Sequence, residues 1–258
     1  MNPLFPLRRL KRGLAEKLGQ MTRPPARIEI DNEPDLLVFD DGTTLAIADP
    51  NRAGFFKRGL WPRLESLRKQ YGIPRSVFGD DLLFLDVGAN IGEFGLLVRK
   101  LGGHYVAFEP DPFAHRALVE NVPEAQVFSV AVSDRNEHRD FFLATATADS
   151  SLFRPLTGEV TEVRVVCDSL DNMAKSISWP ASSRVLLKVE AEGSEPEVLE
   201  GARETLAQVD YVAIDAGPER GGENTAPNCI NLLCSVGFDL EKANLERGCF
   251  FFRKSGSA

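Results

Sequence analysis

Short apolar runs alternate along the chain with polar, glycine-rich turns and with segments of helical periodicity. The run LLFLDV, Leu82–Val87, is almost wholly apolar, which is typical of a parallel strand buried on both faces. After it we expect a glycine-rich turn with a helix through LLVRK, the strand HYVAFE, a helix after Pro112 and the strand AQVFSVAV. This order predicts a β-α-β-α-β unit, one half of a doubly wound sheet.

The segment after AQVFSVAV interrupts this alternation. Two extended stretches, HRDFFLATA and TEVRVVCDSL, flank a polar loop and predict a β-hairpin inserted beside the sheet, at about residues 139–180. Alternation then resumes with the strand RVLLKVE, the helix PEVLEGARETLA, the strand YVAID and the helix NCINLLCSVG. The ending GFDLEKANLERGCFFFRK predicts two strands joined by a turn.

The sequence predicts an N-terminal basic helix and cap in residues 1–80, ahead of the main sheet. Residues 81–258 are predicted to form the main domain. Leucines at three- and four-residue steps among arginines and lysines in residues 4–18 predict a short amphipathic helix. That helix either packs on the protein or rests on an anionic membrane surface. Beyond it, LLVFDDGTTLAIAD predicts a hairpin, and Leu60–Gln70 a helix.

Composition narrows the classes of protein to which the chain belongs. Its 258 residues suit one α/β domain with an appendage, and its net charge of −8 argues against a nucleic-acid partner. The four cysteines lack the spacing of a metal or redox site and predict buried, reduced thiols. Without a signal peptide or an apolar span of about 20 residues, we expect a cytoplasmic protein; its oligomeric state is unknown.

A nucleoside-binding site is indicated by the turn DVGANIGEFG, which begins at Asp86 directly after the buried strand. The interval from Gly88 to Gly92 is longer than in the dinucleotide pattern G-x-G-x-x-G. The Asp86 carboxylate disfavours a pyrophosphate and suits a ligand that carries an ammonium and a sulfonium. Glu109, roughly 20 residues further on, ends the next strand, where an acidic residue accepts hydrogen bonds from ribose hydroxyls. An NAD-dependent oxidoreductase on a similar sheet is an alternative.

Four motifs in order, DVGANIGEFG, VAFEPDP, AVSD and LLKVEAEGSEPEVLEGA, resemble the FkbM family of methyltransferases over about Leu82–Phe252. The resemblance implies an α/β fold with the Rossmann-like, seven-stranded sheet of class I methyltransferases, here with an N-terminal cap and an inserted β-hairpin. It implies S-adenosylmethionine as cofactor and methyl transfer to a hydroxyl of a sugar, glycan or natural product. A non-catalytic module that binds the cofactor or a glycan is a second alternative.

The resemblance also assigns residues to two ligands. The cofactor site it implies consists of Asp86, Gly88, Ala89, Asn90 and Gly92 at the methionine end, Glu109 and Pro110 at the ribose, Ser129, Val130 and Ala131 at the adenine, and Glu190. Ser150 and Ser151, in the inserted hairpin, are expected to face the acceptor.

The fourth motif suggests catalytic residues. The family pattern is close to K-[IL]-D-x-E-G, and here Glu190 replaces the usual Asp between Lys188 and Glu192. Spacing of two along a strand predicts that all three side chains share a face at the carboxyl edge of the sheet, where ligands of open α/β sheets bind. We expect Glu190 or Glu192 to orient or deprotonate the acceptor hydroxyl and Lys188 to tune them. A strand-end ion pair without chemistry is the alternative.

Two further positions are candidates for contacts with the acceptor. Asp215 ends the strand YVAID and is predicted to face Glu190, where the pair has the chemistry to bind Mg²⁺ or Ca²⁺ or to supply a base. A divalent metal is therefore possible but is not predicted. Glu219 and Arg220 lie in the polar loop that follows and are either substrate contacts or surface residues.

Overall fold

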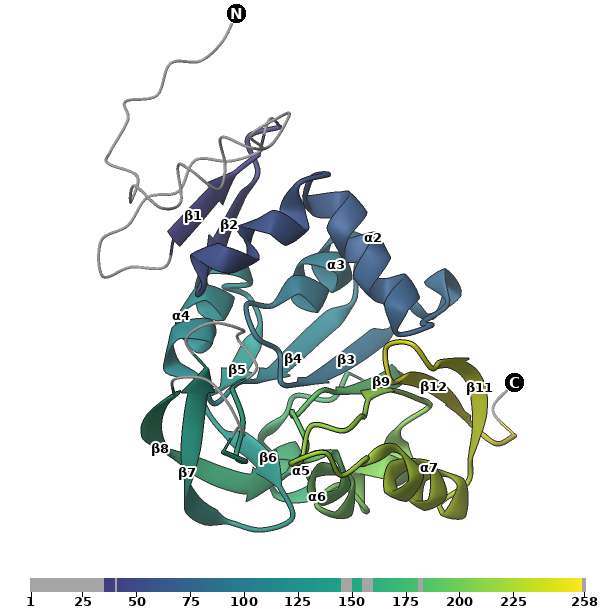
Figure 1. Ribbon diagram of the computed structural model, residues 1–258. Coiled ribbons are helices and arrows are strands. Elements are labelled where there is room, and N and C mark those ends of the chain that lie inside the picture. The colour runs from purple at the N-terminus through teal and green to yellow at the C-terminus, as the bar shows by residue number, and fades with distance from the viewer. Residues whose placement is uncertain (1–34, 40, 145–149, 155–159, 181–182, 257–258) are drawn as a thin grey trace, which may run out of the picture.

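A seven-stranded sheet forms the centre of the computed structural model, which describes residues 35–39, 41–144, 150–154, 160–180 and 183–256 (Figure 1). The strand order is β11-β12-β10-β9-β3-β4-β5, and only β12 runs antiparallel to its neighbours. The strands are β3 (Leu82–Val87), β4 (His104–Phe108), β5 (Gln126–Phe128), β9 (Arg184–Val189), β10 (Tyr211–Asp215), β11 (Phe238–Asn244) and β12 (Cys249–Lys254). The predicted alternation and terminal hairpin are confirmed.

Helices cover both faces of this sheet, and the sequence of β3 reflects that. Leu82 and Phe84 pack into one apolar cluster with α3 (Glu93–Leu101) and α4 (Pro112–Asn121). The alternate residues of β3 pack into a second cluster with α6 (Glu195–Glu200) and α7 (Ala226–Ser235), on the other side of the sheet in Figure 1. Because both faces are buried, the strand needs apolar side chains at successive positions.

The predicted strand AQVFSVAV is wrong as a single element. Its first part is β5, which pairs with β4, whereas its last residues form β6 (Ala131–Ser133) in a second sheet. That second sheet has the order β6-β8-β7 and contains the predicted inserted hairpin, β7 (Glu137–Ala144) and β8 (Val160–Ser169). The chain therefore leaves the main sheet two residues after β5, so the insert is rooted directly beside the carboxyl end of β4.

The predicted helix PEVLEGARETLA is also shorter than expected. α6 ends at Glu200, and a turn leads to a 3₁₀ helix, η4 (Thr205–Gln208). Gly201 packs against the Ser133 carbonyl so closely that a side chain there would overlap it. This contact fixes the end of α6 against β6. A one-turn helix, α5 (Leu170–Met173), and a 3₁₀ turn, η3 (Ala174–Ser176), connect β8 toward β9.

The cap consists of a hairpin and two helices ahead of β3. β1 (Asp35–Val38) pairs antiparallel with β2 (Thr44–Ile47), and the 3₁₀ helix η1 (Pro50–Phe56), α2 (Leu60–Gln70) and the turn η2 (Arg75–Val77) follow. The predicted hairpin and helix are thus confirmed. The predicted basic helix lies outside the described residues. Among the helices that are described, none combines the length and apolar character required to cross a bilayer.

Asn121 joins three parts of the molecule that are distant in sequence. Its Oδ1 accepts a hydrogen bond from the Ala46 N–H at 2.7 Å, and its Nδ2 donates to the carbonyls of Ala46 and Ile91 at 2.9 and 2.8 Å. Asn121 ends α4, Ala46 lies in the cap hairpin, and Ile91 lies in the glycine-rich turn after β3. The amide is buried, so these bonds hold the cap against that turn without competition from water.

We expect Asn121→Ala to lower the free energy of unfolding by about 1–3 kcal/mol, because the Ala46 N–H would remain buried without an acceptor. Glu120→Ala is the matched control, since Glu120 precedes Asn121 on the same helix but is exposed. Urea denaturation of both variants measures the difference. Equal stability of the two would show that the amide does not hold the cap.

Candidate functional site

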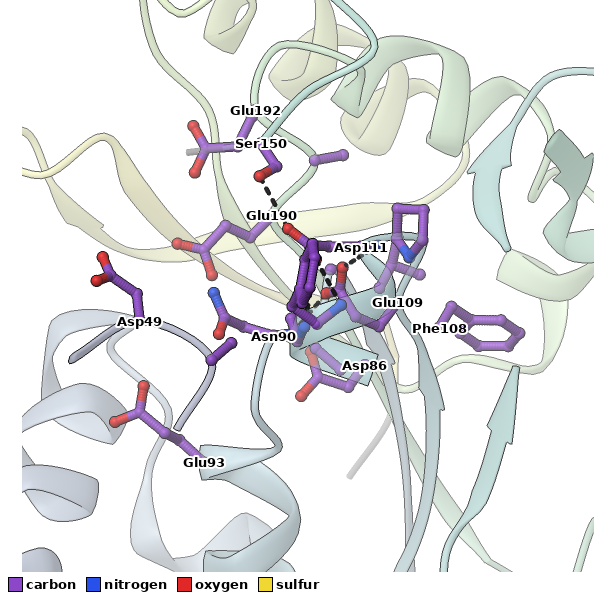
Figure 2. Close-up of a pocket in the computed structure, with 18 of the residues that line it drawn as sticks. Asp49, Asp86, Asn90, Glu93, Phe108, Glu109, Asp111, Ser150, Glu190 and Glu192 are labelled. Atoms are coloured by element: carbon purple, nitrogen blue, oxygen red, sulfur yellow. Dashed lines mark hydrogen bonds between the residues drawn. The ribbon is translucent and has the colours of Figure 1, made fainter. Parts of the chain in front are cut away.

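A cavity of about 700 Å³ opens at the carboxyl ends of β3, β4 and β9. This volume lies within the range of about 300–1,000 Å³ that is usual for small-molecule sites. The loops after those strands form its base, and the cap and the inserted sheet form its walls. Figure 2 shows Asp49 of the cap and Phe108 of β4 on opposite sides, with Asn90, Glu109 and Glu190 between them.

The turn after β3 contains three residues with positive φ angles and packs tightly against the loop after β9 and against α4. Gly88, Asn90 and Gly92 adopt left-handed φ angles of 71°, 49° and 80°. A side chain at Gly88 would overlap the Glu190 carbonyl oxygen, and one at Gly92 would meet Leu118 of α4 at 2.5 Å. Packing of the protein on itself therefore requires both glycines.

Residues of this turn differ in their access to the cavity. Gly88, Ala89 and Asn90 line it, as predicted for the methionine end of the cofactor. Gly92 lies outside the lining, directly before the first residue of α3. Its contact with the cofactor stays a prediction.

Glu109 is held rigidly at the carboxyl end of β4. Its Oε2 accepts a hydrogen bond from the Asn90 N–H at 2.7 Å, and its Oε1 accepts one from the Asp111 N–H at 2.8 Å. Burial raises the pKa of Glu109 to about 7, against the effect of those two N–H donors. Each carboxylate oxygen retains a lone pair, so the group is able to accept further hydrogen bonds from a ligand. Pro110, also predicted, lines the cavity beside it.

Lys188 lies at the centre of a buried network of charges. Its Nζ is 3.0 Å from Asp86 Oδ1 and 3.1 Å from Glu190 Oε2, and it donates a hydrogen bond of 2.7 Å to the Gly88 carbonyl. Burial opposes a charge on Lys188, but the two carboxylates outweigh it and raise the pKa of the ammonium. Lys188 therefore stays protonated, and it links the end of β9 to the turn after β3.

Each carboxylate oxygen of Asp86 has a partner within this network. Oδ1 faces Lys188, and Oδ2 accepts a hydrogen bond of 2.6 Å from the Tyr105 hydroxyl. The side chain is 1% exposed, although it borders the cavity. Its geometry supports a role in holding Lys188, and direct contact with a ligand stays a prediction.

Glu190 and Glu192 both line the cavity, and Glu190 lies on the same side as Lys188, with which it pairs, but the predicted strand spacing fails at Glu192. β9 ends at Val189, and Glu192 has a left-handed φ of 46°, so strand periodicity does not continue that far. The Glu190 side chain is 37% exposed. Burial raises its pKa, but Lys188 and other donors and cations outweigh that effect and bring the pKa below its ordinary value. Glu190 is thus an ionised carboxylate within reach of a ligand.

The inserted sheet contributes one predicted polar residue and several apolar ones to the cavity wall. Ser150 lines the cavity and donates a hydrogen bond of 3.0 Å to Asp111 Oδ2. Ser151 is buried behind the wall, where its hydroxyl donates to the Glu192 carbonyl at 2.7 Å. Three apolar residues of the insert also line the cavity: Phe141, Leu143 and Leu152.

Several other predicted site residues lie outside the cavity lining. Ser129 is exposed, whereas Val130 and Ala131 after it do line the cavity. Arg220 donates to the Gly193 carbonyl at 2.9 Å and pairs with Glu197, so its guanidinium holds the loop after β9. The exposed Glu219 also lies away from the lining.

Asp215 lies behind the cavity next to a thiol. Its Oδ2 accepts a hydrogen bond from Cys249 Sγ at 3.3 Å. Burial, together with the charge of Glu190, raises the pKa of Asp215 to about 6. Asp215 is not among the residues that line the cavity, and its predicted position facing Glu190 stays a prediction. Within the described residues, no group of three or more His, Cys, Asp or Glu side chains is arranged to hold a metal ion.

The cap supplies a wall of the cavity that the sequence did not predict. Arg63, Leu67 and Gln70 lie along one face of α2 and line the cavity, together with Arg52 and Phe55 of η1. Arg63 forms a two-pronged ion pair with Glu93 at the start of α3, with distances of 2.7 and 3.1 Å. No motif marks these residues in the sequence, because their role depends on how the cap folds over the sheet.

Comparison with known protein families identifies the chain. The family model described as the methyltransferase FkbM domain matches residues 86–240, from the end of β3 into β11. The chain belongs to the FkbM methyltransferase family. It is an S-adenosylmethionine-dependent methyltransferase with the expected Rossmann-like α/β fold, so the oxidoreductase and non-catalytic alternatives are wrong.

Individual relatives are distant. The 2-O-methyltransferase NoeI of Sinorhizobium fredii (strain NBRC 101917 / NGR234) is 24% identical over 204 residues, which cover 71% of this chain and 83% of NoeI. Magnesium protoporphyrin IX methyltransferase from Synechocystis PCC 6803, solved with bound S-adenosylmethionine, is 10% identical over 79% of this chain and 83% of its own, with a TM-score of 0.44. A methyltransferase from Aquifex aeolicus is 15% identical over 80% and 93%, with a TM-score of 0.39.

Gly88→Ala should be far more damaging than Gly222→Ala, although both glycines have positive φ angles, 71° and 91°. At Gly222 nothing lies within 4 Å of an added Cβ, so only backbone strain of about 1–2 kcal/mol is expected. At Gly88 the overlap with the Glu190 carbonyl adds about 1–3 kcal/mol more. Thermal unfolding of both variants measures the difference. Similar melting temperatures would contradict the tight packing of Gly88, after β3, against the Glu190 carbonyl, after β9.

We expect adenosine to bind about tenfold more tightly at about pH 8 than at about pH 6, because Glu109, with a pKa of about 7, is mostly ionised only at the higher pH. The ionised carboxylate accepts hydrogen bonds from ribose hydroxyls, and protonation removes an acceptor. Adenosine itself does not titrate in this interval. Calorimetric titration measures the affinities; Glu109→Gln should bind weakly and equally at both pH values. A wild-type affinity that is independent of pH would place the ribose elsewhere.

Proposed function

We propose that this FkbM methyltransferase transfers a methyl group to a hydroxyl of a glycan or a related natural product. The observation that carries the proposal is the Glu190 carboxylate, which Lys188 holds in its ionised form at the edge of the cavity. The name of the relative NoeI, a 2-O-methyltransferase, supports oxygen as the accepting atom. The concave cavity also suits a small-molecule or glycan acceptor. The net charge of −8 argues against a nucleic acid as the acceptor, because the protein would repel its phosphates.

The residues around the cavity fit S-adenosylmethionine in type and arrangement. Glu109 would accept hydrogen bonds from the ribose, and Gly88, Ala89 and Asn90 would lie along the methionine portion. Val130 and Ala131 offer an apolar edge for the adenine. When bound, the cofactor supplies a methyl group that its sulfonium already activates. The protein therefore has to align the acceptor oxygen with that methyl group and keep water away.

Glu190 is the group we assign to the acceptor hydroxyl. As an ionised carboxylate it accepts a hydrogen bond from the hydroxyl and so turns an oxygen lone pair toward the methyl group. As the new carbon–oxygen bond forms and the bond from the methyl carbon to the sulfonium sulfur breaks, with its electron pair left on sulfur, the acceptor oxygen would become positively charged and its proton strongly acidic. A carboxylate of low pKa is then a sufficient base, and the proton passes to Glu190. Lys188 keeps that carboxylate in place through the 3.1 Å ion pair.

Glu192 has a different place in the proposal. Its side chain also lines the cavity, but it follows the left-handed turn after β9 and is linked through its carbonyl to Ser151 of the insert. We assign it to acceptor binding. The cap elements η1 and α2 and the inserted sheet, which wall the cavity, would then select the acceptor.

Replacing Glu190 should separate catalysis from cofactor binding. We expect Glu190→Gln to reduce methyl transfer about 10²–10⁴-fold, because the amide accepts no proton, while affinity for S-adenosylhomocysteine changes little. Glu190→Asp should restore part of the activity, and Glu192→Gln should raise KM more than it lowers kcat. Transfer from radiolabelled S-adenosylmethionine to a panel of methyl glycosides and their deoxy analogues provides the assay.

The controls distinguish the ways in which the proposal can fail. Unchanged turnover in Glu190→Gln would remove Glu190 from catalysis but leave the methyltransferase activity intact. Labelling of deoxy analogues that is equal to labelling of the parent glycosides would show that a hydroxyl is not the acceptor.

A further inference from the structure

The cap end of the cavity has features that methyl transfer to a neutral hydroxyl does not require. η1 and the first turn of α2 place three large side chains there, Arg52, Phe55 and Arg63. In Figure 2 the cap residue Asp49, which immediately precedes η1, lies on the opposite side of the cavity from Phe108. Because η1 begins directly after Asp49, we expect the side chains of η1 to meet the part of the acceptor that lies away from the adenosine portion of the cofactor.

Some of the cationic side chains that line the cavity are paired with carboxylates of described residues and others are not. Four cationic side chains of the described residues line it: Arg52, Arg63, Lys188 and Arg247. Lys188 is paired with Asp86 and Glu190, and Arg63 with Glu93. Within the same part of the chain, neither Arg52 nor Arg247 forms an ion pair with a carboxylate. In a chain that carries eight more acidic than basic residues, an arginine left unpaired on a cavity wall is available to an anionic ligand.

Arg52 and Glu190 line the same cavity. Burial raises the pKa of Glu190, and Lys188 and, more weakly, Arg52 lower it through their charges. The neighbouring acid Asp49 forms no ion pair with this guanidinium among the described residues; its Oδ1 accepts hydrogen bonds from the backbone and side chain of Asn51 at 2.8 and 2.9 Å. One acceptor molecule is thus able to reach both Glu190 and Arg52.

Phe55 adds an apolar platform at the same place. Its ring is 56% exposed although it lines the cavity, and such exposure of a large aromatic side chain calls for an explanation. The guanidinium carbons of Arg52 and Arg63 lie 5.5 and 5.0 Å from its centroid. These two contacts hold the ring in position and leave part of its surface for a ligand, such as the C–H face of a sugar ring.

We propose that the acceptor is an anionic glycan, whose carboxylate, phosphate or sulfate group pairs with Arg52 while the sugar ring that bears it packs on Phe55. This inference rests on the proposed transfer to a glycan hydroxyl and names the class of glycan. Arg52 is preferred to Arg247 because it adjoins the exposed ring and acts on Glu190. Selection against neutral sugars follows, since they would leave the guanidinium without a partner.

The test compares sugars that differ only at C6, which bears a carboxylate in one member of each pair and a neutral hydroxymethyl group in the other. Methyl glucuronide and methyl glucoside form one pair of probes, and methyl galacturonide and methyl galactoside form a second. Binding to the full chain saturated with S-adenosylhomocysteine is measured by saturation-transfer NMR and titration. We expect the anionic member of at least one pair to bind about tenfold more tightly, the gain of one charge-assisted hydrogen-bonded pair.

Three variants assign that preference to residues. Arg52→Gln should abolish it, and Arg58→Gln, which removes the same charge from an exposed neighbour outside the cavity, should retain it. Phe55→Ala should weaken binding of both members of a pair and leave their ratio unchanged. Circular dichroism and S-adenosylhomocysteine affinity show whether each variant remains folded.

The outcomes that overturn the proposal are distinct from failure of the proposed function. An absence of preference in both pairs, whether the sugars bind equally or not at all, overturns it, as does a preference that survives in Arg52→Gln. A loss of S-adenosylhomocysteine affinity in a folded Arg52→Gln also overturns it, because Arg52 would then hold the cofactor's carboxylate. The proposed function fails separately, if no glycoside hydroxyl accepts the radiolabelled methyl group.

Discussion

The ammonium of Lys188, buried between two carboxylates, is the interaction on which the rest of the site depends. A charge with 2% exposure is unfavourable unless it is paired, and here Asp86 and Glu190 both neutralise it. The parallel register of β3 and β9 sets Asp86 opposite Lys188, so the sheet itself dictates the first pair. The hydrogen bond to the Gly88 carbonyl then ties the turn after β3 to the same ammonium. Loss of Lys188 would leave two acids without compensation and release that turn.

The cap is fastened to this arrangement at two points. Asn121 binds the cap hairpin and the turn after β3 at once, and the Arg63–Glu93 pair joins α2 to the start of α3. Both links end on the segment that we expect to hold the cofactor. The glycine-rich turn after β3 and the start of α3 therefore position both the cap wall, which faces the acceptor, and the floor of the cavity, which faces the cofactor. Alignment of two reactants requires such a common support.

Much of the sheet was predictable from the sequence, because strands buried on both faces need continuous apolar runs. The positions of Asp86, Glu109 and Lys188 follow from the same runs, since each lies at or near the end of a strand whose carboxyl end meets its neighbours. Glu192 was placed wrongly because nothing in VEAEG marks where β9 ends. The guanidinium of Arg220 was assigned to substrate because a polar, glycine-rich loop does not reveal that an arginine binds a carbonyl within the protein. Arg52 and Phe55 carry no motif at all, and only the packing of the cap brings them to the cavity.

The pairing of Asp86 with Lys188 also has a consequence for the order of folding. The two residues are far apart in the chain, and the hydrogen bond from Lys188 to Gly88 alone spans 100 positions. A nascent chain that has not yet produced β9 would have to bury Asp86 without its counter-charge and would leave the edge of β3 unpaired. Strand β3 is thus unable to adopt its final environment until β9, about 100 residues further along the chain, has been synthesised, and the pair forms through long-range contacts that are slow to close.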